Sequence, residues 1–312
     1  MIKLFSGTSN LELAKRVSKI LQLPLSKAEI TRFANSEVRV RIEEDVKDKT
    51  CVVIQSTSNP TDTNLMELFL FCDALRRSEA KKVIAVIPYF GYARQNIQHR
   101  VGECVSVNVI IRFLESIGFS KVYTIDLHDE ATEGVFSIPF KNLTALPILA
   151  KRVKNYLEKK GIKPLPENIA IVSPDQGGIE RARKFGKAFF ETSNFPLAVV
   201  EKQRNLAKIH LSKAIGLYGD VKNKIAILVD DILTSGRTLI NAAELCLSAG
   251  AKATLAAIVH HDFSKDAPEK LIHGPLEKIF TTDTIKLLEN QTFEKLEEIS
   301  IASLIADQIQ NL

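Results

Sequence analysis

The chain has 312 residues, with 42 Lys and Arg against 37 Asp and Glu, which gives a net charge of +5 at pH 7. Hydrophobic residues make up 45% and charged residues 25%, ordinary proportions for a globular protein that exclude a fibre and a mostly disordered chain. The positive charges are spread along the sequence, whereas a nucleic-acid-binding protein usually concentrates them in a patch. We therefore expect small anionic ligands and no nucleic acid.

The length limits the architecture, because a chain of this size usually forms about two domains. We place them in residues 1–145 and 146–312, and the last helix can pack back on the first domain. Residues 163–168 are the most linker-like stretch, but they are equally typical of a loop that enters a strand of the second domain.

The apolar runs are of strand length, far below the roughly 20 residues that a membrane span requires. The first five residues run straight into a strand-like pattern, without the features of a signal peptide. We therefore expect a cytoplasmic protein that contacts no membrane. The four cysteines lie far apart, and buried thiols are the simplest interpretation.

Short β-branched runs alternate with amphipathic stretches along most of the chain. Continuous apolar runs are typical of strands buried on both faces, and therefore of parallel sheets covered by helices, so we predict an α/β fold. The strict alternation in residues 37–42 is instead typical of a hairpin or flap with one wet face. The other expected strands cover residues 52–55, 83–88, 122–127, 169–172, 197–200, 225–229 and 253–259. The expected helices cover residues 11–21, 63–75, 105–117, 146–157, 179–190 and 238–247.

The two halves share one faint similarity. Residues 122–126 and 225–230 are both apolar strands that end in aspartate and are followed by a polar loop. This hints at two copies of one βα architecture.

The sharpest motif is the segment 229–238, Val-Asp-Asp-Ile-Leu-Thr-Ser-Gly-Arg-Thr, between a predicted buried strand and a predicted helix. Ligands of open α/β sheets bind at the carboxyl ends of strands, and a helix N-terminus offers unpaired N–H groups to a phosphate. Asp230 and Asp231 can hydrogen-bond ribose hydroxyls, although an acidic turn with a capping residue would explain that pair alone. The groups suited to a 5-phosphate belong to Thr234, Ser235, Gly236, Arg237 and Thr238.

This segment resembles the phosphoribosyl pyrophosphate loop of type I phosphoribosyltransferase folds. From near residue 3 to the last helix, the chain resembles the ribose-phosphate pyrophosphokinase family, with five further segments in the same order and spacing. The resemblance implies two phosphoribosyltransferase-like (type I) domains, the first contacting ATP and the second binding ribose 5-phosphate. It also implies transfer of the β,γ-diphosphate of ATP to the C1 hydroxyl of ribose 5-phosphate, giving phosphoribosyl pyrophosphate and AMP for nucleotide biosynthesis.

Two segments of the first half, residues 33–37 and 88–95, are similar to the family's ATP-contacting segments. An aromatic ring at position 33 can cover a purine face, and a guanidinium can grip phosphate oxygens. The aromatic residues at 89, 90 and 92 are more often core residues than ligand platforms. The resemblance implies ATP contacts by Phe33, Asn35, Ser36, Glu37, Arg94 and Gln95.

Residues 125–128 and 173–178 resemble the family's metal-linked segments. A diphosphate transfer needs Mg²⁺ on the ATP phosphates, with few protein ligands and several retained waters. The resemblance implies that His128 and Asp175 bind this Mg²⁺, directly or through water. Asp175 is the better candidate, because imidazole is not a preferred Mg²⁺ ligand and a lone histidine is more often a core residue.

The segment 199–204 leads from a strand into a basic loop. The resemblance implies that Lys202 and Arg204 close over the substrates as catalytic residues, with Arg204 also binding ribose 5-phosphate. Two such cations could stabilise the charge of the transition state, and closure would exclude water. For the two charges alone, a solvated basic hairpin is the alternative.

The sequence departs from the family pattern at several positions. Thr234 and Asn96 stand where the family commonly has aspartate, and Arg237 stands where it commonly has glycine, which adds a cation beside the 5-phosphate. Residues 102–108 diverge from a stretch that forms the family's phosphate and ADP regulatory site and a subunit contact. We expect a homo-oligomer, either a dimer or a higher assembly such as a hexamer.

Three other functions remain open. A phosphoribosyltransferase would share residues 229–238, but it would leave Arg94, Gln95, Lys202 and Arg204 unexplained. A catalytically silent paralogue that regulates an active partner would bind ATP without turnover, as would a pure nucleotide-binding module. Release of AMP that depends on ribose 5-phosphate would separate these alternatives from the pyrophosphokinase.

Overall fold

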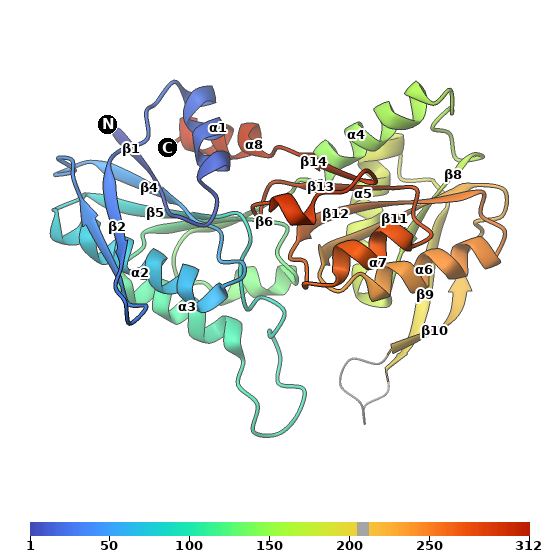
Figure 1. The fold of residues 1–312 in the computed structure, drawn as a ribbon, viewed down its shortest axis with the longest axis horizontal. Coiled ribbons are helices and arrows are strands. Elements are labelled where there is room, and N and C mark those ends of the chain that lie inside the picture. The colour runs from blue at the N-terminus through green and yellow to red at the C-terminus, as the bar shows by residue number, and fades with distance from the viewer. Residues whose placement is uncertain (205–211) are drawn as a thin grey trace. The chain divides into compact units, whose positions relative to one another are not determined.

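The computed structural model describes the backbone of residues 1–204 and 212–312, and the side chains of residues 1–201 and 216–312 (Figure 1). It divides into two compact units. Unit 1 comprises Met1–Thr144, Thr284–Lys286 and Ser300–Leu312, and unit 2 comprises Ala145–Asp283 and Leu287–Ile299. Among the helices of the described part, none has both the length and the apolar character that crossing a membrane requires.

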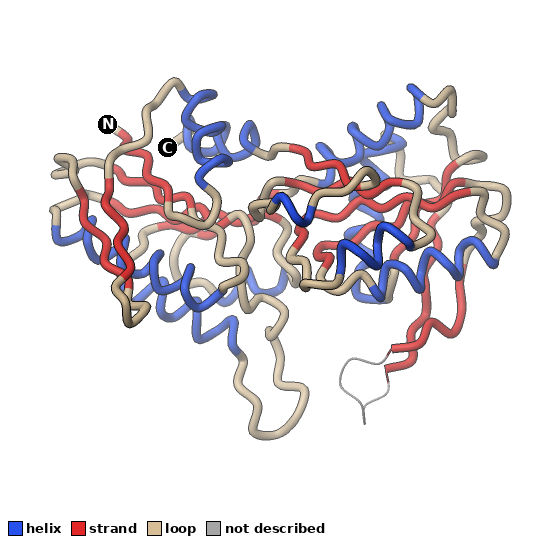
Figure 2. Tube along the Cα trace, in the orientation of Figure 1, coloured by secondary structure: helices blue, strands red, loops and turns tan. Residues whose placement is uncertain are grey.

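Unit 1 is built on a five-stranded parallel sheet in the order β1-β4-β5-β6-β7, with a separate antiparallel hairpin of β2 and β3. Its strands are β1 Ile2–Ser6, β2 Ala28–Arg32, β3 Val38–Ile42, β4 Thr50–Ile54, β5 Lys82–Ile87, β6 Lys121–Ile125 and β7 Phe140–Leu143. Its helices are α1 Leu11–Leu21, α2 Thr61–Arg77, α3 Ser106–Ile117, the 3₁₀ helix η1 Glu130–Val135 and α8 Ala302–Gln310. Helices α1 and α8 lie on one face of the sheet, and α2 and α3 lie on the other (Figure 2).

Unit 2 is built on a seven-stranded sheet in the order β10-β9-β8-β11-β12-β13-β14, in which only β10 runs antiparallel to its neighbour. Its strands are β8 Ile169–Ser173, β9 Leu197–Arg204, β10 Ser212–Tyr218, β11 Ile225–Leu233, β12 Ala253–His261, β13 Lys278–Thr282 and β14 Leu296–Ile299. Its helices are α4 Leu146–Lys159, α5 Ile179–Phe190, α6 Arg237–Ser248, α7 Ala267–His273 and the 3₁₀ helices η2 Gln176–Gly178 and η3 Glu289–Gln291. Residues 163–168 lie inside unit 2, between α4 and β8.

Local sequence accounts for where many of these elements start and stop. The Asn10 side chain accepts a hydrogen bond from the Leu13 N–H and caps α1. Gly118 ends α3 in the left-handed conformation, at φ 105°, where a Cβ would be strained. The central strands are buried along nearly their whole length, because uninterrupted apolar residues face helices on both sides.

The prediction of an α/β fold with mostly parallel sheets flanked by helices is confirmed. The helices expected at residues 11–21 and 179–190 coincide with α1 and α5, and the expected flap is the hairpin of β2 and β3. The strands β2, β7, β10, β13 and β14 were not predicted, since they lack long apolar runs or lie at sheet edges.

The two units repeat one order of elements, in which a strand, a helix and a hairpin precede four more parallel strands. The helix that follows the last strand is exchanged in both cases: α4 follows β7 but packs on α5 in unit 2, and α8 follows β14 but packs on α1 in unit 1. Residues 122–126 and 225–230 are both strands, but they occupy different places in this order, because β6 corresponds to β13 and β11 corresponds to β4. The matching segments are Lys-Val-Tyr-Thr-Ile-Asp at 121–126 and Lys-Ile-Phe-Thr-Thr-Asp at 278–283.

Candidate active site

Three carboxylates gather at the carboxyl end of two neighbouring strands of unit 2. Strands β8 and β11 pair in parallel from Ile169 with Ile225 onward, so Asp175 just beyond β8 and the acidic pair in β11 lie at the same sheet edge. Asp231 is buried, with 5% of its side chain exposed, and Asp230 has 16% exposed. Three carboxylates that the sequence motifs single out therefore lie at one edge of the sheet.

Arg181 holds the two aspartates of β11, and its role was not predicted. Its Nη1 atom lies 3.4 Å from Oδ1 of Asp230 and 3.3 Å from Oδ1 of Asp231. The arginine lies in the first turn of α5, the helix that follows Asp175, and only 13% of its side chain is exposed. This guanidinium fixes the orientation of the carboxylates and partly offsets their charge.

The electrostatics of this edge are unbalanced toward negative charge. Burial raises the pKa of Asp230 well above its usual range, the neighbouring carboxylate of Asp231 raises it further, and the Arg181 guanidinium opposes the shift. Asp175 also raises the pKa of Asp230 through its charge. A ligand that brings hydroxyl donors or a cation would offset this excess negative charge, and ribose hydroxyls and Mg²⁺ are two such groups.

The segment that follows β11 turns sharply into α6. Gly236 has φ 75° at the N-cap of the helix, where no side chain caps the first turn. A Cβ at this position would be strained by the conformation and would lie 3.2 Å from Leu271 Cδ2. The Thr234 carbonyl accepts a hydrogen bond from the Ser264 N–H at 3.2 Å, which anchors the loop. The start of α6 thus offers backbone N–H groups and the hydroxyls of Ser235 and Thr238 to an anion.

Arg237 is the first residue of α6, and its side chain is exposed. It forms no ion pair with any residue in the described part of the chain. Arg237 is therefore an exposed cation at the N-terminus of α6.

Asp175 shapes its own loop. Its Oδ1 accepts a hydrogen bond from the Gly178 N–H at 3.1 Å, and its carbonyl accepts one from the Ser173 hydroxyl at 2.6 Å. His128 is exposed and belongs to unit 1, so each of the two predicted metal contacts is described within its own unit. Over the described ranges, no three His, Cys, Asp or Glu side chains are grouped as a metal site.

The predicted ATP segment at residues 33–37 forms the exposed tip of the hairpin of β2 and β3. The Asn35 Oδ1 atom accepts a hydrogen bond from the Glu37 N–H at 3.3 Å, and Ser36 adopts φ 70°. These two residues therefore shape the turn. Phe33 has 48% of its surface exposed, with the Arg39 guanidinium 5.8 Å from its ring centroid, so the ring remains accessible to a flat ligand.

The second predicted ATP segment precedes α3. Arg94 is exposed and makes no ion pair with a residue that the structure describes. The Gln95 carbonyl accepts a hydrogen bond from the Val107 N–H at 3.3 Å, and its side-chain oxygen accepts one from the Ser106 hydroxyl. Gln95 thus fixes the loop to the start of α3, which leaves Arg94 as the exposed cation of the pair.

Asn96 joins this loop to the segment that contains His128. Its side-chain amide donates a hydrogen bond to the Asp129 carboxylate, which also caps η1 by accepting from the Ala131 N–H at 2.9 Å. An aspartate at position 96 would face this carboxylate with a second negative charge. The amide therefore suits its surroundings in this chain.

The side chains of Lys202 and Arg204 lie outside the described residues, and so does the placement of 205–211. The backbone of β9 is described, and it pairs with β8 up to Val199 opposite Ser173. Beyond that level β9 continues to Arg204, on the side of the sheet where the carboxylates gather. The catalytic roles of Lys202 and Arg204 stay predictions.

Known proteins resemble this chain along its whole length. A family model of the N-terminal domain of ribose phosphate pyrophosphokinase matches residues 2–118, and a phosphoribosyl synthetase-associated domain model matches residues 167–312. A ribose-phosphate pyrophosphokinase of Fusobacterium nucleatum is 39% identical, covering 100% of this chain and 95% of that protein. A ribose-phosphate pyrophosphokinase 1 of Streptococcus agalactiae is 36% identical, covering 99% and 92%.

The fold is similar as well. The crystal structure of phosphoribosylpyrophosphate synthetase from Mycobacterium smegmatis superposes with a TM-score of 0.89 at 31% identity, covering 99% of this chain and 97% of that one. The matches include both units and the strand edge where the carboxylates gather, which confirms the resemblance inferred from the motifs. The chain therefore belongs to the ribose-phosphate pyrophosphokinase family.

Proposed function

We propose that this chain transfers the β,γ-diphosphate of ATP to the C1 hydroxyl of ribose 5-phosphate, which yields phosphoribosyl pyrophosphate and AMP for nucleotide biosynthesis. The observation that carries the proposal is the identity of 36–39% to ribose-phosphate pyrophosphokinases over essentially the full chain. A phosphoribosyltransferase would need only the sugar-phosphate edge of unit 2. The similarity of unit 1, with its predicted ATP segments, favours the pyrophosphokinase.

Ribose 5-phosphate would bind at the carboxyl end of β11. Asp230 and Asp231 would accept hydrogen bonds from the ribose hydroxyls, while Arg181 holds both carboxylates in place. The 5-phosphate would bind at the start of α6, where unpaired N–H groups and the helix dipole favour an anion. The side groups that support it there are Thr234, Ser235, Arg237 and Thr238, around the close backbone of Gly236.

ATP would be bound through unit 1. Phe33 offers a ring face to adenine, and Glu37 offers a carboxylate to its edge or ribose, on a turn that Asn35 and Ser36 shape. Arg94 would bind phosphate oxygens through its planar fork. Gln95 would hold that arginine's loop against α3.

The reaction breaks one bond and forms another. The C1 hydroxyl oxygen attacks the β-phosphorus of ATP, the bond from that phosphorus to the oxygen bridging to the α-phosphorus breaks, and AMP leaves with the electron pair. The hydroxyl proton passes to water, because a phosphoryl-type transfer depends mainly on positioning and charge stabilisation and no residue is assigned as a base. Lys202 and Arg204 would approach the phosphates from β9 and stabilise the developing charge.

Mg²⁺ fits this edge, since carboxylate oxygens are its preferred ligands and the edge holds excess negative charge. Asp175 would hold it, directly or through water, and His128 is the second candidate contact. When bound with ATP, Mg²⁺ neutralises phosphate charge and aligns the diphosphate. We further propose a cytoplasmic homo-oligomer, a dimer or a higher assembly, that binds neither nucleic acid nor membranes.

The test is an assay of the purified chain with Mg-ATP and ribose 5-phosphate, in which AMP and phosphoribosyl pyrophosphate are separated by chromatography. Equal amounts of both products are expected, and none without ribose 5-phosphate. ATP binding without AMP would indicate a silent paralogue. Transfer of the ribose 5-phosphate group of phosphoribosyl pyrophosphate to a base, with release of pyrophosphate, would indicate a phosphoribosyltransferase.

A further inference from the structure

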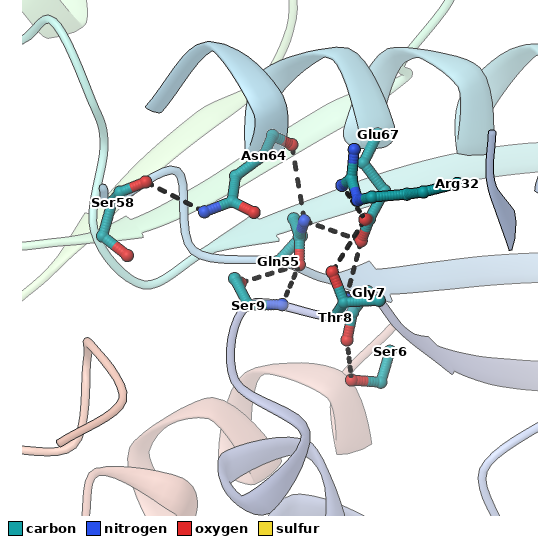
Figure 3. Close-up of polar contacts among 9 residues, drawn as sticks. All are labelled: Ser6, Gly7, Thr8, Ser9, Arg32, Gln55, Ser58, Asn64 and Glu67. Atoms are coloured by element: carbon teal, nitrogen blue, oxygen red, sulfur yellow. Dashed lines mark hydrogen bonds and ion pairs between the residues drawn. The ribbon is translucent and has the colours of Figure 1, made fainter. Parts of the chain in front are cut away.

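A buried polar network fills the carboxyl end of β1 and β4 in unit 1 (Figure 3). Its centre is Glu67 of α2, whose side chain is fully buried. Around it lie the turn after β1, the end of β2, the end of β4 and the first half of α2. A buried carboxylate is costly unless its oxygens are satisfied, so the contacts of Glu67 reveal what it stabilises.

Both oxygens of Glu67 are fully used. Oε1 accepts hydrogen bonds from the Thr8 N–H at 2.6 Å and from Gln55 Nε2 at 2.9 Å. Oε2 accepts from the Thr8 hydroxyl at 2.7 Å and from Arg32 Nη2 at 2.9 Å. Arg32 is the cation among these donors, and 36% of its side chain is exposed while its partner is buried. The Arg32 contact is therefore a charge-assisted hydrogen bond with one end inside the protein.

The turn after β1 is held by hydrogen bonds and packs closely against the side chains of Gln55 and Glu67. Gln55 Oε1 accepts from the Ser9 N–H at 3.1 Å and from the Ser9 hydroxyl at 2.7 Å. A Cβ on Gly7 would lie only 2.2 Å from Gln55 Oε1 and 2.8 Å from Glu67 Oε1. The carboxylate of Glu67 is thus held rigidly from this side, and it presents a fixed point to Arg32.

Arg32 is the last residue of β2, directly before the exposed turn at residues 33–37. All five turn residues are exposed, so packing against the core does not determine their position. The strands behind them are anchored separately, since Ile30 and Val40 pack on the hydrophobic core. The Phe33 N–H donates to the Glu37 carbonyl at 2.9 Å and so shapes the turn, while the ion pair of Arg32 with Glu67 holds the end of the hairpin that carries it.

We propose that Glu67 is a positioning residue for ATP: through Arg32, it sets the place of the Phe33–Glu37 turn that contacts the nucleotide. This inference rests on the proposed function, because it assigns ATP to that turn. Loss of the ion pair should weaken ATP binding without affecting ribose 5-phosphate, whose predicted groups belong to unit 2.

The primary variant is Arg32→Gln, which removes the cation and leaves the Gly7 turn intact. We expect its KM for ATP to rise about tenfold, the usual effect of losing one hydrogen bond to a charged group. The KM for ribose 5-phosphate and kcat should change by less than about twofold, and Arg32→Lys should recover part of the loss. Glu29→Gln is the matched control, because its exposed carboxylate contacts Arg39, Arg41 and the Thr31 hydroxyl, all within the same hairpin, and does not belong to the Glu67 network. It should match the wild type.

Glu67→Gln separates positioning from direct contact. If Glu67 acts through Arg32, folded Glu67→Gln raises the KM for ATP as Arg32→Gln does, and the double variant is no worse than the more severe single variant. If Arg32 binds ATP itself, Glu67→Gln keeps a nearly normal KM, and the inference is wrong. Equal increases of both KM values in Arg32→Gln, or a lower melting temperature with unchanged kinetics, would also overturn it.

Failure of the proposed function would look different. In that case the wild type would release no AMP, and the dissociation constant for Mg-ATP measured by calorimetry would replace KM. A tenfold weaker dissociation constant in Arg32→Gln, with Glu29→Gln unchanged, would support the role of Glu67, and equal dissociation constants would overturn it.

Discussion

The carboxyl ends of the strands share one topology in the two units, but they carry different polar and charged side chains. In unit 1, Gln55 follows β4 and, with Glu67, uses its polar atoms on the turn after β1. In unit 2, Asp230 stands at the corresponding point of β11 beside Asp231 and Arg181, and its pKa is raised by burial and by the charge of Asp231. The difference teaches that topology supplies the edge, and that the acidic side chains gathered on the unit 2 edge suit it to a ligand with hydroxyl donors or a cation.

The hairpins of the two units differ in the same sense. Arg32 is the last residue of β2 and Arg204 is the last residue of β9, each directly before the hairpin loop. In unit 1 the arginine is fixed by the buried Glu67. In unit 2 the corresponding arginine is one of the two predicted catalytic cations. The same position at the end of a hairpin strand thus holds a structural arginine in unit 1 and a predicted catalytic arginine in unit 2.

The largest expected effect is a loss of kcat when Lys202, in the hairpin of unit 2, is replaced. Lys202→Ala should lower kcat by about 10²–10³-fold, the usual effect of removing one group that stabilises transition-state charge. ATP affinity, measured by calorimetry, should change little, and Lys222→Ala on the same unit serves as the control. A kcat within twofold of the wild type would remove Lys202 from the mechanism.

A second carboxylate at the carboxyl end of β4 in unit 1, as in the acidic edge of unit 2, should lower the stability of the fold. Gln55→Glu places a second carboxylate where the amide now donates to Glu67 at 2.9 Å. A buried charge without a partner costs about 3 kcal/mol, so we expect a fall of that size in the free energy of unfolding, measured with urea. If Gln55→Glu is as stable as the wild type, the carboxyl end of β4 tolerates a second charge, and the difference between the two units is not electrostatic.

Removing one charge from the acidic edge of unit 2 should instead raise the stability of the fold. Because the pKa of Asp230 is raised in the folded state, wild-type stability falls as the pH rises above the unfolded value near 4. Asp230→Asn should therefore raise the melting temperature at pH 7, with the gain vanishing near pH 3. The same variant should increase the KM for ribose 5-phosphate about tenfold, through loss of a charge-assisted hydrogen bond. A lower melting temperature at pH 7 would contradict this account.

The smallest effect concerns the exposed cation of the sugar-phosphate loop. Arg237→Gly should raise the KM for ribose 5-phosphate about threefold at low salt, since an exposed charge contributes roughly 1 kcal/mol or less. The difference from the wild type should shrink in 0.5 M KCl, because salt screens exposed charges. A difference that persists at high salt would point to a conformational effect of the glycine.

The sequence was most informative where local signals are strong. Uninterrupted apolar runs and amphipathic stretches predicted most of the helices and central strands. Residues 229–238 predicted the acidic pair close to the start of α6, although β11 continues through that pair to Leu233. The groups that tertiary structure brings in were missed. Arg181 is 49 positions from Asp230 along the chain, on another element. Glu67 lies among the apolar residues of α2, where a helical pattern gives no reason to expect a satisfied carboxylate.

The place of each strand in the internal repeat was not predicted, because β6 and β11 share apolar residues and a terminal aspartate although they occupy different places in the repeated order. The shared Lys, aromatic, Thr and Asp positions of residues 121–126 and 278–283 were present in the sequence. The expectation that residue 146 begins the second domain and that the last helix can pack on the first has no local signal behind it, since both helices follow their last strand directly in the chain.

The number of ribose 5-phosphate sites per chain tests most directly whether only the unit 2 edge is a sugar-phosphate site. Calorimetric titration in the presence of Mg²⁺ and α,β-methylene-ATP, whose α–β link cannot be cleaved, would count them without turnover. We predict one site per chain, lost in Asp231→Asn. Two sites, or one site that survives in a folded Asp231→Asn variant, would contradict the account.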